Sequence, residues 1–147
     1  MILDKESMFS DDQAITATAA STNIIDLGAT GTVVGSSSAL KRYLGQGEPI
    51  EILVQWTATA VSGGSSTVTV DLETDDNSGF SSAATLATTG AIVKATLVQG
   101  HRMSIKFMPE KTERYLRLNF TVATANLTAG TVTAGLVMGT QTNVNNA

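Results

Sequence analysis

The chain has 147 residues, of which 42% are hydrophobic and 15% charged, and this composition predicts one folded domain and excludes a disordered, highly charged segment. The absence of cysteine excludes a disulfide framework and a cysteine-ligated zinc site. A net charge of −4 argues against nucleic acid as a partner, and no stretch approaches the ~20 apolar residues of a membrane span.

The N-terminal stretch "MILDKESMFSDDQ" carries charges where a signal peptide needs an apolar segment, so we expect the protein to be made in a cytoplasm. Weak periodicity predicts an N-terminal arm at residues 1–12 and a polar tail at 139–147, around one domain at 13–138. Four apolar side chains of the arm are candidates either for contact with a partner or for closing one end of the fold: Ile2, Leu3, Met8 and Phe9.

Apolar and polar side chains alternate along five segments, and this period of two predicts strands with one buried face. The segments are residues 50–60, 67–74, 101–109, 115–123 and 131–138. Weaker strand candidates are residues 13–19, 22–27 and parts of 84–98. The alternation turns Trp56 toward the core, turns Asp71 and Glu73 toward solvent, and places Met138 on the inward side of the last segment.

Turn-forming residues separate these segments, for example in "SGGSS", "DDNSG" and "TANLTAG". Only "SSALKRYLG", residues 37–45, suggests a short helix, with Ser38 as its N-cap. The predicted fold is therefore all-β: a single-domain antiparallel sandwich or barrel of about eight strands with short terminal arms.

The acidic stretch "DLETDDNSGFSSAATL", residues 71–86, has the residue types of a metal or catalytic loop. Calcium-loop spacing from Glu73 fails because Ser78 stands where the loop requires glycine, although a looser calcium site stays open as an alternative. Asp71 and Glu73 are about 6.6 Å apart on one strand face, near the separation of paired carboxylates in sugar hydrolysis, but no aromatic platform lies beside them. We expect a solvated turn.

Other enzyme signatures fail as well. His101 is the single histidine, and no serine lies in the G-x-S-x-G context of a nucleophile elbow. The glycines of "GATGTVVG" have the wrong spacing for a dinucleotide loop. The sequence therefore predicts no enzyme, no cofactor and no metal site.

Later in the chain, basic residues gather after an acidic first half, and Arg114, Tyr115 and Arg117 are candidates for an interface because arginine and tyrosine are enriched there. Complementary acidic and basic patches could orient partner or identical subunits.

Three segments in order, "MILDKESMFSDDQAITATAASTNIIDLG", "VDLETDDNSGFSSAATL" and "ERYLRLNFTVATANLTAGTVTAGLV", resemble the small capsid cement, or decoration, proteins of tailed bacteriophages of the Bordetella-phage type. The resemblance covers nearly the whole chain and includes no catalytic motif. It implies a jelly-roll subunit that forms a homo-oligomer, a dimer or trimer, about a symmetry axis. On the outer surface of the virion, such a subunit bridges neighbouring major capsid proteins and stabilises the shell.

The alternative is a carbohydrate-binding jelly-roll module for attachment to a host surface, which would need exposed aromatic side chains. Tyr43, Tyr115 and Phe80 are the candidates for that role. A third possibility is a β domain stabilised by calcium.

Overall fold

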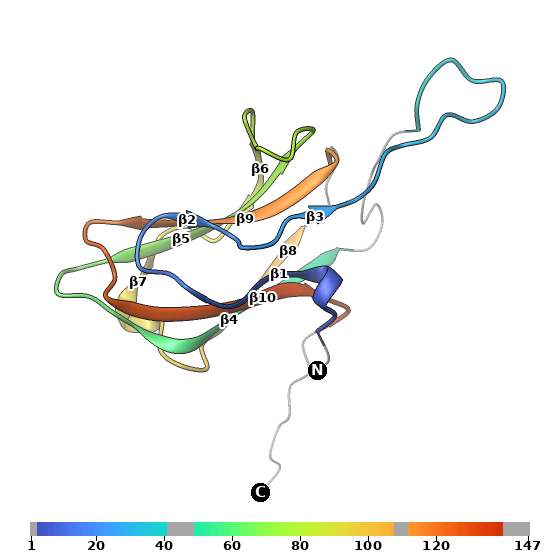
Figure 1. Cartoon of the computed structure of the whole chain (residues 1–147). Coiled ribbons are helices and arrows are strands. Elements are labelled where there is room, and N and C mark those ends of the chain that lie inside the picture. The colour runs from blue at the N-terminus through green and yellow to red at the C-terminus, as the bar shows by residue number, and fades with distance from the viewer. Residues whose placement is uncertain (1–2, 41–48, 108–111, 140–147) are drawn as a thin grey trace, which may run out of the picture.

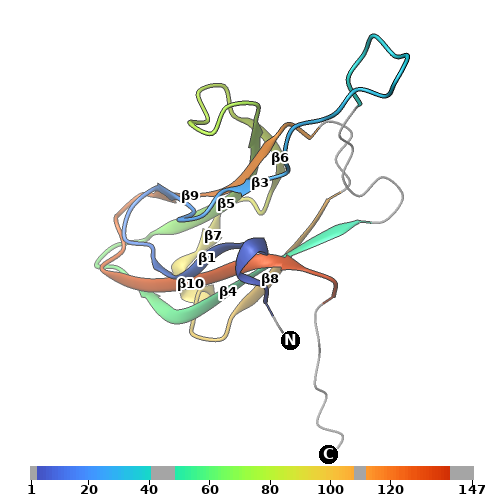
Figure 2. The same cartoon turned by 45° about the vertical axis from the view of Figure 1, so that its right-hand side comes forward.

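The computed structural model describes residues 3–40, 49–107 and 112–139, and these form two antiparallel sheets packed face to face (Figures 1 and 2). Two short 3-10 helices are present, η1 (Lys5–Ser7) and η2 (Lys94–Thr96). The strands are β1 (Met8–Ala14), β2 (Ala19–Ala20), β3 (Ile25–Asp26), β4 (Ile50–Val61), β5 (Thr67–Asp75), β6 (Ala84–Thr88), β7 (Ile92–Val93), β8 (Arg102–Phe107), β9 (Tyr115–Ala123) and β10 (Ala129–Val137).

The strand order is that of a jelly roll. One sheet has the order β1-β10-β4-β8, and the other has β2-β9-β5-β6 with β3 added on β9 and β7 on β5. Because β2 and β3 follow one another along β9, and β6 and β7 along β5, the ten strands fill eight positions in two four-membered layers. The predicted antiparallel sandwich of about eight strands is confirmed.

The core lies between the sheets and contains the inward side chains that the alternation predicts. Trp56 is fully buried on β4, as expected. Eleven other buried members lie on β4, β5, β8, β9 and β10: Ile52, Val54, Val68, Val70, Leu72, Ile105, Leu116, Leu118, Phe120, Val132 and Ala134. Met138 was predicted to face inward, which is wrong: β10 ends at Val137, so Met138 lies beyond the ladder and is fully exposed.

The first strand of the sandwich begins within the predicted N-terminal arm, residues 1–12. β1 begins at Met8 and pairs with β10, and Phe9 has no exposed surface and belongs to the core. Residues 8–12 therefore form part of an edge strand, and of the two roles considered for the N-terminal apolar residues, Phe9 closes the fold. The physical reason is the partner strand β10, more than a hundred residues away in the sequence, whose ladder the local pattern does not reveal.

Just before β1, the N-terminal segment covers the outer face of the four-stranded sheet. A Cβ atom on Gly135 would lie 3.2 Å from the Ser7 carbonyl oxygen and 3.4 Å from Leu3 Cδ2, so the missing side chain leaves room for this segment. Gly135 pairs with both Met8 and Leu53, and Leu53 is buried although it points away from the main core.

The helix predicted at residues 37–45 is not seen at its described start. Ser38 lies in a bend and Ala39 forms an antiparallel bridge with Thr32. The remainder of that prediction, residues 41–45, lies outside the described residues.

Replacing Gly130 by alanine is expected to lower the free energy of unfolding by about 1–3 kcal/mol, the usual cost of overpacking. Gly130 has φ +140°, and its Cβ would lie 2.8 Å from Trp56 Cζ3 and 3.2 Å from Ala60 Cα. Urea denaturation measures the change. Gly63→Ala is the control, because no atom lies within 4 Å of its Cβ position, and an equal loss in both variants would contradict the steric argument.

Phe9→Ala is expected to lower the free energy of unfolding by about 3–5 kcal/mol, because it empties a fully buried aromatic site. Met138→Ala, at an exposed position, should change it by less than about 0.5 kcal/mol. A small change in the free energy of unfolding for Phe9→Ala would contradict the core position of Phe9 and favour the predicted separate arm at residues 1–12. Deleting those residues removes most of β1, so that deletion does not separate binding from folding.

Candidate functional site

The feature that stands furthest from the sandwich is the segment of residues 28–40, here called the projecting hairpin (Figures 1 and 2). Its two arms are joined by the bridge between Thr32 and Ala39 and by a hydrogen bond of 2.9 Å from the Leu40 N–H to the Gly31 carbonyl. Residues 29–40 are all exposed. The segment therefore presents its side chains to the surroundings instead of to the core.

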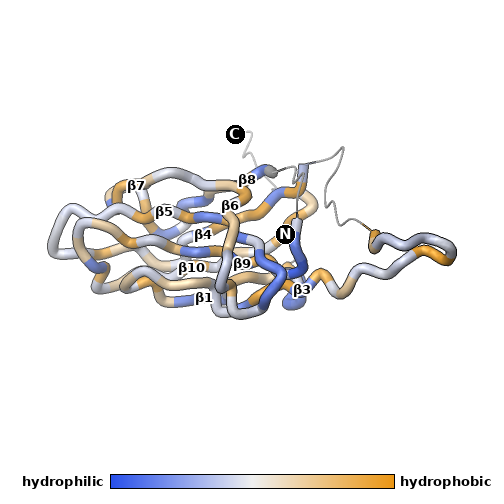
Figure 3. The backbone as a smooth tube through the Cα atoms, turned by 90° about the horizontal axis from the view of Figure 1, so that it is seen from above, coloured by the Kyte–Doolittle hydropathy of each residue, from blue (hydrophilic) through white to orange (hydrophobic). Residues whose placement is uncertain are grey.

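The tip of the projecting hairpin is apolar. Ser36 N–H donates to the Val33 carbonyl at 2.9 Å, and Gly35 has φ +85°, which a type II turn requires at its third position. This turn exposes Val34 completely and Val33 by 55%. Figure 3 shows the end of the segment in the colour of hydrophobic residues. No residue from 28 to 40 carries an ionisable side chain.

Arg114 anchors the root of this hairpin. Its Nε and Nη2 donate to the two carboxylate oxygens of Asp26 at 2.8 and 2.7 Å, and its carbonyl accepts from Leu27 N–H. Asp26 Oδ1 also accepts from Gly28 N–H at 2.8 Å. The hydrogen bonds that Arg114 donates to Asp26 raise the pKa of Arg114, so its guanidinium stays charged. The guanidinium lies 4.9 Å from the ring centroid of Tyr115, which places two predicted interface residues at the root of the hairpin.

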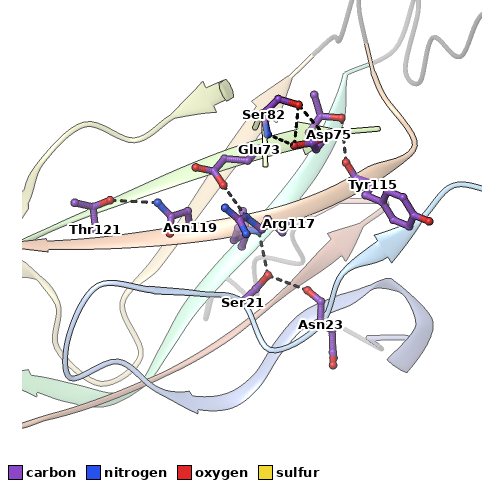
Figure 4. A network of polar contacts seen from close by, with 11 residues as sticks. Ser21, Asn23, Glu73, Asp75, Ser82, Tyr115, Arg117, Asn119 and Thr121 are labelled. Atoms are coloured by element: carbon purple, nitrogen blue, oxygen red, sulfur yellow. Dashed lines mark hydrogen bonds and ion pairs between the residues drawn. The ribbon is translucent and has the colours of Figure 1, made fainter. Parts of the chain in front are cut away.

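Arg117, the third basic or aromatic candidate, lies on the outer face of the six-stranded sheet (Figure 4). Its Nε donates to Glu73 Oε2 at 2.7 Å, and its guanidinium lies 4.1 Å from the ring centroid of Phe80. Glu73 and Asp71 face outward, as predicted, and are half-buried. The carboxylate partners that the structure gives to Arg114 and Arg117 thus belong to the same chain; whether either arginine also contacts another subunit stays a prediction.

The acidic loop that follows β5 is organised by Asp75, which is buried (Figure 4). Its carboxylate accepts from Asn77 N–H at 2.9 Å, from Ser82 N–H at 2.8 Å and from the Ser82 hydroxyl at 3.3 Å. The hydrogen bond from Asn77 lowers the pKa of Asp75 below its ordinary value. These bonds close the loop and place Phe80, at φ +51°, under Arg117. Asp75 is thus engaged in holding the turn.

The four apolar candidates of the N-terminal segment lie in different surroundings. Ile2 lies outside the described residues, Phe9 is in the core, and Leu3 and Met8 lie near Gly135. A shallow groove of about 380 Å³ borders this region and is lined by Lys5, Glu6, Met8, Thr22, Asn23 and Ile24. Its lining mixes two charged groups with two apolar ones, and no chemistry is assembled there.

The described aromatic side chains are poorly placed for stacking on a sugar. Phe80 is buried beneath Arg117, and the half-buried ring of Tyr115 is covered by Arg114. Tyr43 lies outside the described residues. Across the described ranges, no cluster of three or more histidine, cysteine or acidic residues is arranged to hold a metal ion, and no helix is long and apolar enough to cross a membrane.

The projecting hairpin has a signal in the sequence that is distinct from the strand pattern. "GATGTVVGSSSAL" lacks any charge and places two valines between glycines, outside the alternation that defines the strands. Its glycines lack the spacing of a dinucleotide loop, and the helix predicted at residues 37–45 is not seen at its described start.

Asp75→Asn is expected to destabilise the protein at neutral pH, because an amide nitrogen replaces an oxygen that accepts backbone N–H groups. The carboxylate has a lowered pKa when folded, so its contribution is complete above the ordinary aspartate pKa of about 3.9 and is lost as pH falls through the lower folded value. Urea denaturation from neutral pH into that acid range measures the free energy of unfolding of both proteins. The difference between wild type and variant should decrease as the pH falls. Asp11→Asn, at an exposed position, is the control. A difference in unfolding free energy between wild type and Asp75→Asn that stays constant with pH would contradict the stabilising role of the Asp75 carboxylate.

Comparison with known proteins identifies the family. The family model Bbp16 matches residues 9–136, which includes every strand except the first residue of β1 and the last of β10. No curated protein matches the chain. The family name indicates a Bordetella phage protein and agrees at that level with the resemblance found in the sequence. The chain therefore belongs to the Bbp16 family and is a phage-related protein.

Proposed function

We propose that this protein is a structural virion protein that binds the outer face of a phage capsid and cements neighbouring major capsid proteins. The observation that carries the proposal is the Bbp16 match over residues 9–136, taken with the resemblance of three ordered segments to phage cement proteins. The major capsid protein and further copies of this chain, as a dimer or trimer, are the partners. The protein is made in the host cytoplasm and resides on the outer surface of the capsid.

The mechanism is adhesive and has no chemical step. A subunit that binds the assembled shell, but not separated capsid subunits, stabilises the shell by mass action. The stabilisation is about 2.7 kcal/mol per site at a free concentration a hundred times the Kd. Linked contacts on several capsid subunits raise the effective affinity without stronger individual contacts.

The architecture supports such a role. The jelly roll closes its core between two sheets, and the two anchoring arginines are each paired with a carboxylate of the chain, Arg114 with Asp26 and Arg117 with Glu73. The projecting hairpin extends from this body. A folded body with an extended contact element suits a protein that spans the boundary between two shell subunits. No observation on the described residues favours the carbohydrate-binding alternative.

Adding the purified protein to capsid shells that lack it is expected to raise the temperature at which the shells disassemble. Calorimetry of the shells measures this shift, and co-sedimentation measures binding. An unrelated β-sandwich of similar size and net charge is the control. A protein that neither sediments with the shells nor changes their disassembly temperature would overturn the proposal. Light scattering tests the oligomer separately: a monomer at all concentrations contradicts only the expected dimer or trimer.

A further inference from the structure

The projecting hairpin exposes an apolar cluster that the sandwich does not use. Val34 is completely exposed at the turn, and Val33 and Leu40 are each 55% exposed. Exposed single apolar residues are ordinary in soluble proteins, but here three are carried on one segment that extends away from the body (Figure 3).

We infer that this hairpin docks into an apolar, uncharged recess on the outer surface of the capsid shell. The inference rests on the proposed function and names the element that makes the contact. The hairpin has no ionisable side chain from residue 28 to 40, so its burial removes no charge from water. A partner surface that matches it is apolar at the centre, with hydrogen-bonding groups only at its rim.

The polar groups near the tip are already partly satisfied. The Ser36 hydroxyl donates to the Ser38 carbonyl at 3.2 Å and accepts from Ser38 N–H at 3.2 Å. The Ser36 N–H and the Leu40 N–H each donate within the hairpin. Insertion of the tip therefore keeps those three N–H groups and the Ser36 hydroxyl paired, while the remaining polar groups of residues 33–38 need hydrogen-bonding partners at the rim of the recess.

The root of the hairpin is fixed before binding. Asp26 accepts two hydrogen bonds from Arg114 and a third from Gly28 N–H, so the direction in which the hairpin leaves β3 is set by the fold. An element held in its bound orientation loses less conformational entropy when it binds. Arg114 acts here as a positioning residue and not as a contact with the shell.

A second copy of the chain fits this tip poorly over the surface that the structure describes. Outside the hairpin, Val61, Val93 and Val98 are exposed on stretches joined by hydrogen bonds from Ala60 N–H to the Leu97 carbonyl and from Lys94 Nζ to the Ser62 carbonyl, so the charge of Lys94 lies close to them. The groove beside η1 presents the charges of Lys5 and Glu6. A neutral, apolar tip is thus better matched by a different protein, and under the proposed function that protein is the capsid subunit.

The test compares three variants in co-sedimentation with shells that lack the protein. Val34→Asp is expected to weaken binding about ten- to hundredfold or more, since it loses a buried valine and places a charge in an apolar recess. Val34→Thr keeps the branched shape and replaces one methyl group with a hydroxyl, so it should weaken binding less and cannot be dismissed as misfolded. Val98→Asp is the matched control, because Val98 is a valine outside any strand that is 48% exposed and remote from the hairpin in sequence.

The outcomes separate this inference from the proposed function. Binding by wild type and Val98→Asp, with loss in both Val34 variants at unchanged melting temperature, supports the hairpin as the docking element. Equal binding by all variants overturns the inference and leaves the cementing function in place. If wild type itself fails to bind, the function fails and the inference with it. If Val34→Asp changes only the oligomeric state in light scattering, a second copy covers the tip and the inference is wrong.

Discussion

Burial of the inward faces of four long strands, β4, β5, β9 and β10, is the constraint on which the remaining structure depends. These strands form the centres of the two sheets and supply most of the core around Trp56. Because the side-chain period of a strand is two, fixing their inward residues also fixes which residues face outward. The outward positions of Glu73 and Arg117, and therefore the salt bridge between them, follow from that single choice of register.

Asp26 and Asp75 each stabilise a turn at the end of a strand. Asp26 accepts the N–H of Gly28 and Asp75 accepts the N–H of Asn77, so each carboxylate turns the chain two residues beyond itself at the end of a strand. Arginines at the start of β9 complete both arrangements: Arg114 binds Asp26, and Arg117 lies over Phe80 in the loop that Asp75 closes. The short run from residue 114 to 117 therefore contacts both the root of the projecting hairpin and the acidic loop. Its residues were predicted as an interface, and what the structure shows for them is positioning within the chain.

Charge and exposure are distributed unevenly over the molecule, and this matters for an adhesive role. The sandwich carries the ionisable groups among the described residues, whereas the projecting hairpin carries none. Under the proposed docking, the specificity of the contact depends on shape and on the exclusion of charge, and not on electrostatic steering. The family match locates the protein among phage proteins, and the hairpin is the part of this fold most available to a large partner surface.

The sequence by itself determined the fold class and the five strands β4, β5, β8, β9 and β10, because alternation is a local property that each strand carries alone. β9 was predicted at its observed bounds, and the inward side chains of β4 and β5 were assigned correctly. The tertiary structure decided what depends on distant partners. Phe9 belongs to the core because β10 pairs with β1, Met138 is exposed because that ladder ends at Val137, and Asp75 is buried because Ser82 folds back onto it. The direction of the projecting hairpin likewise depends on Asp26 meeting Arg114, 88 residues away, and a contact between such distant residues leaves no periodic trace in the sequence.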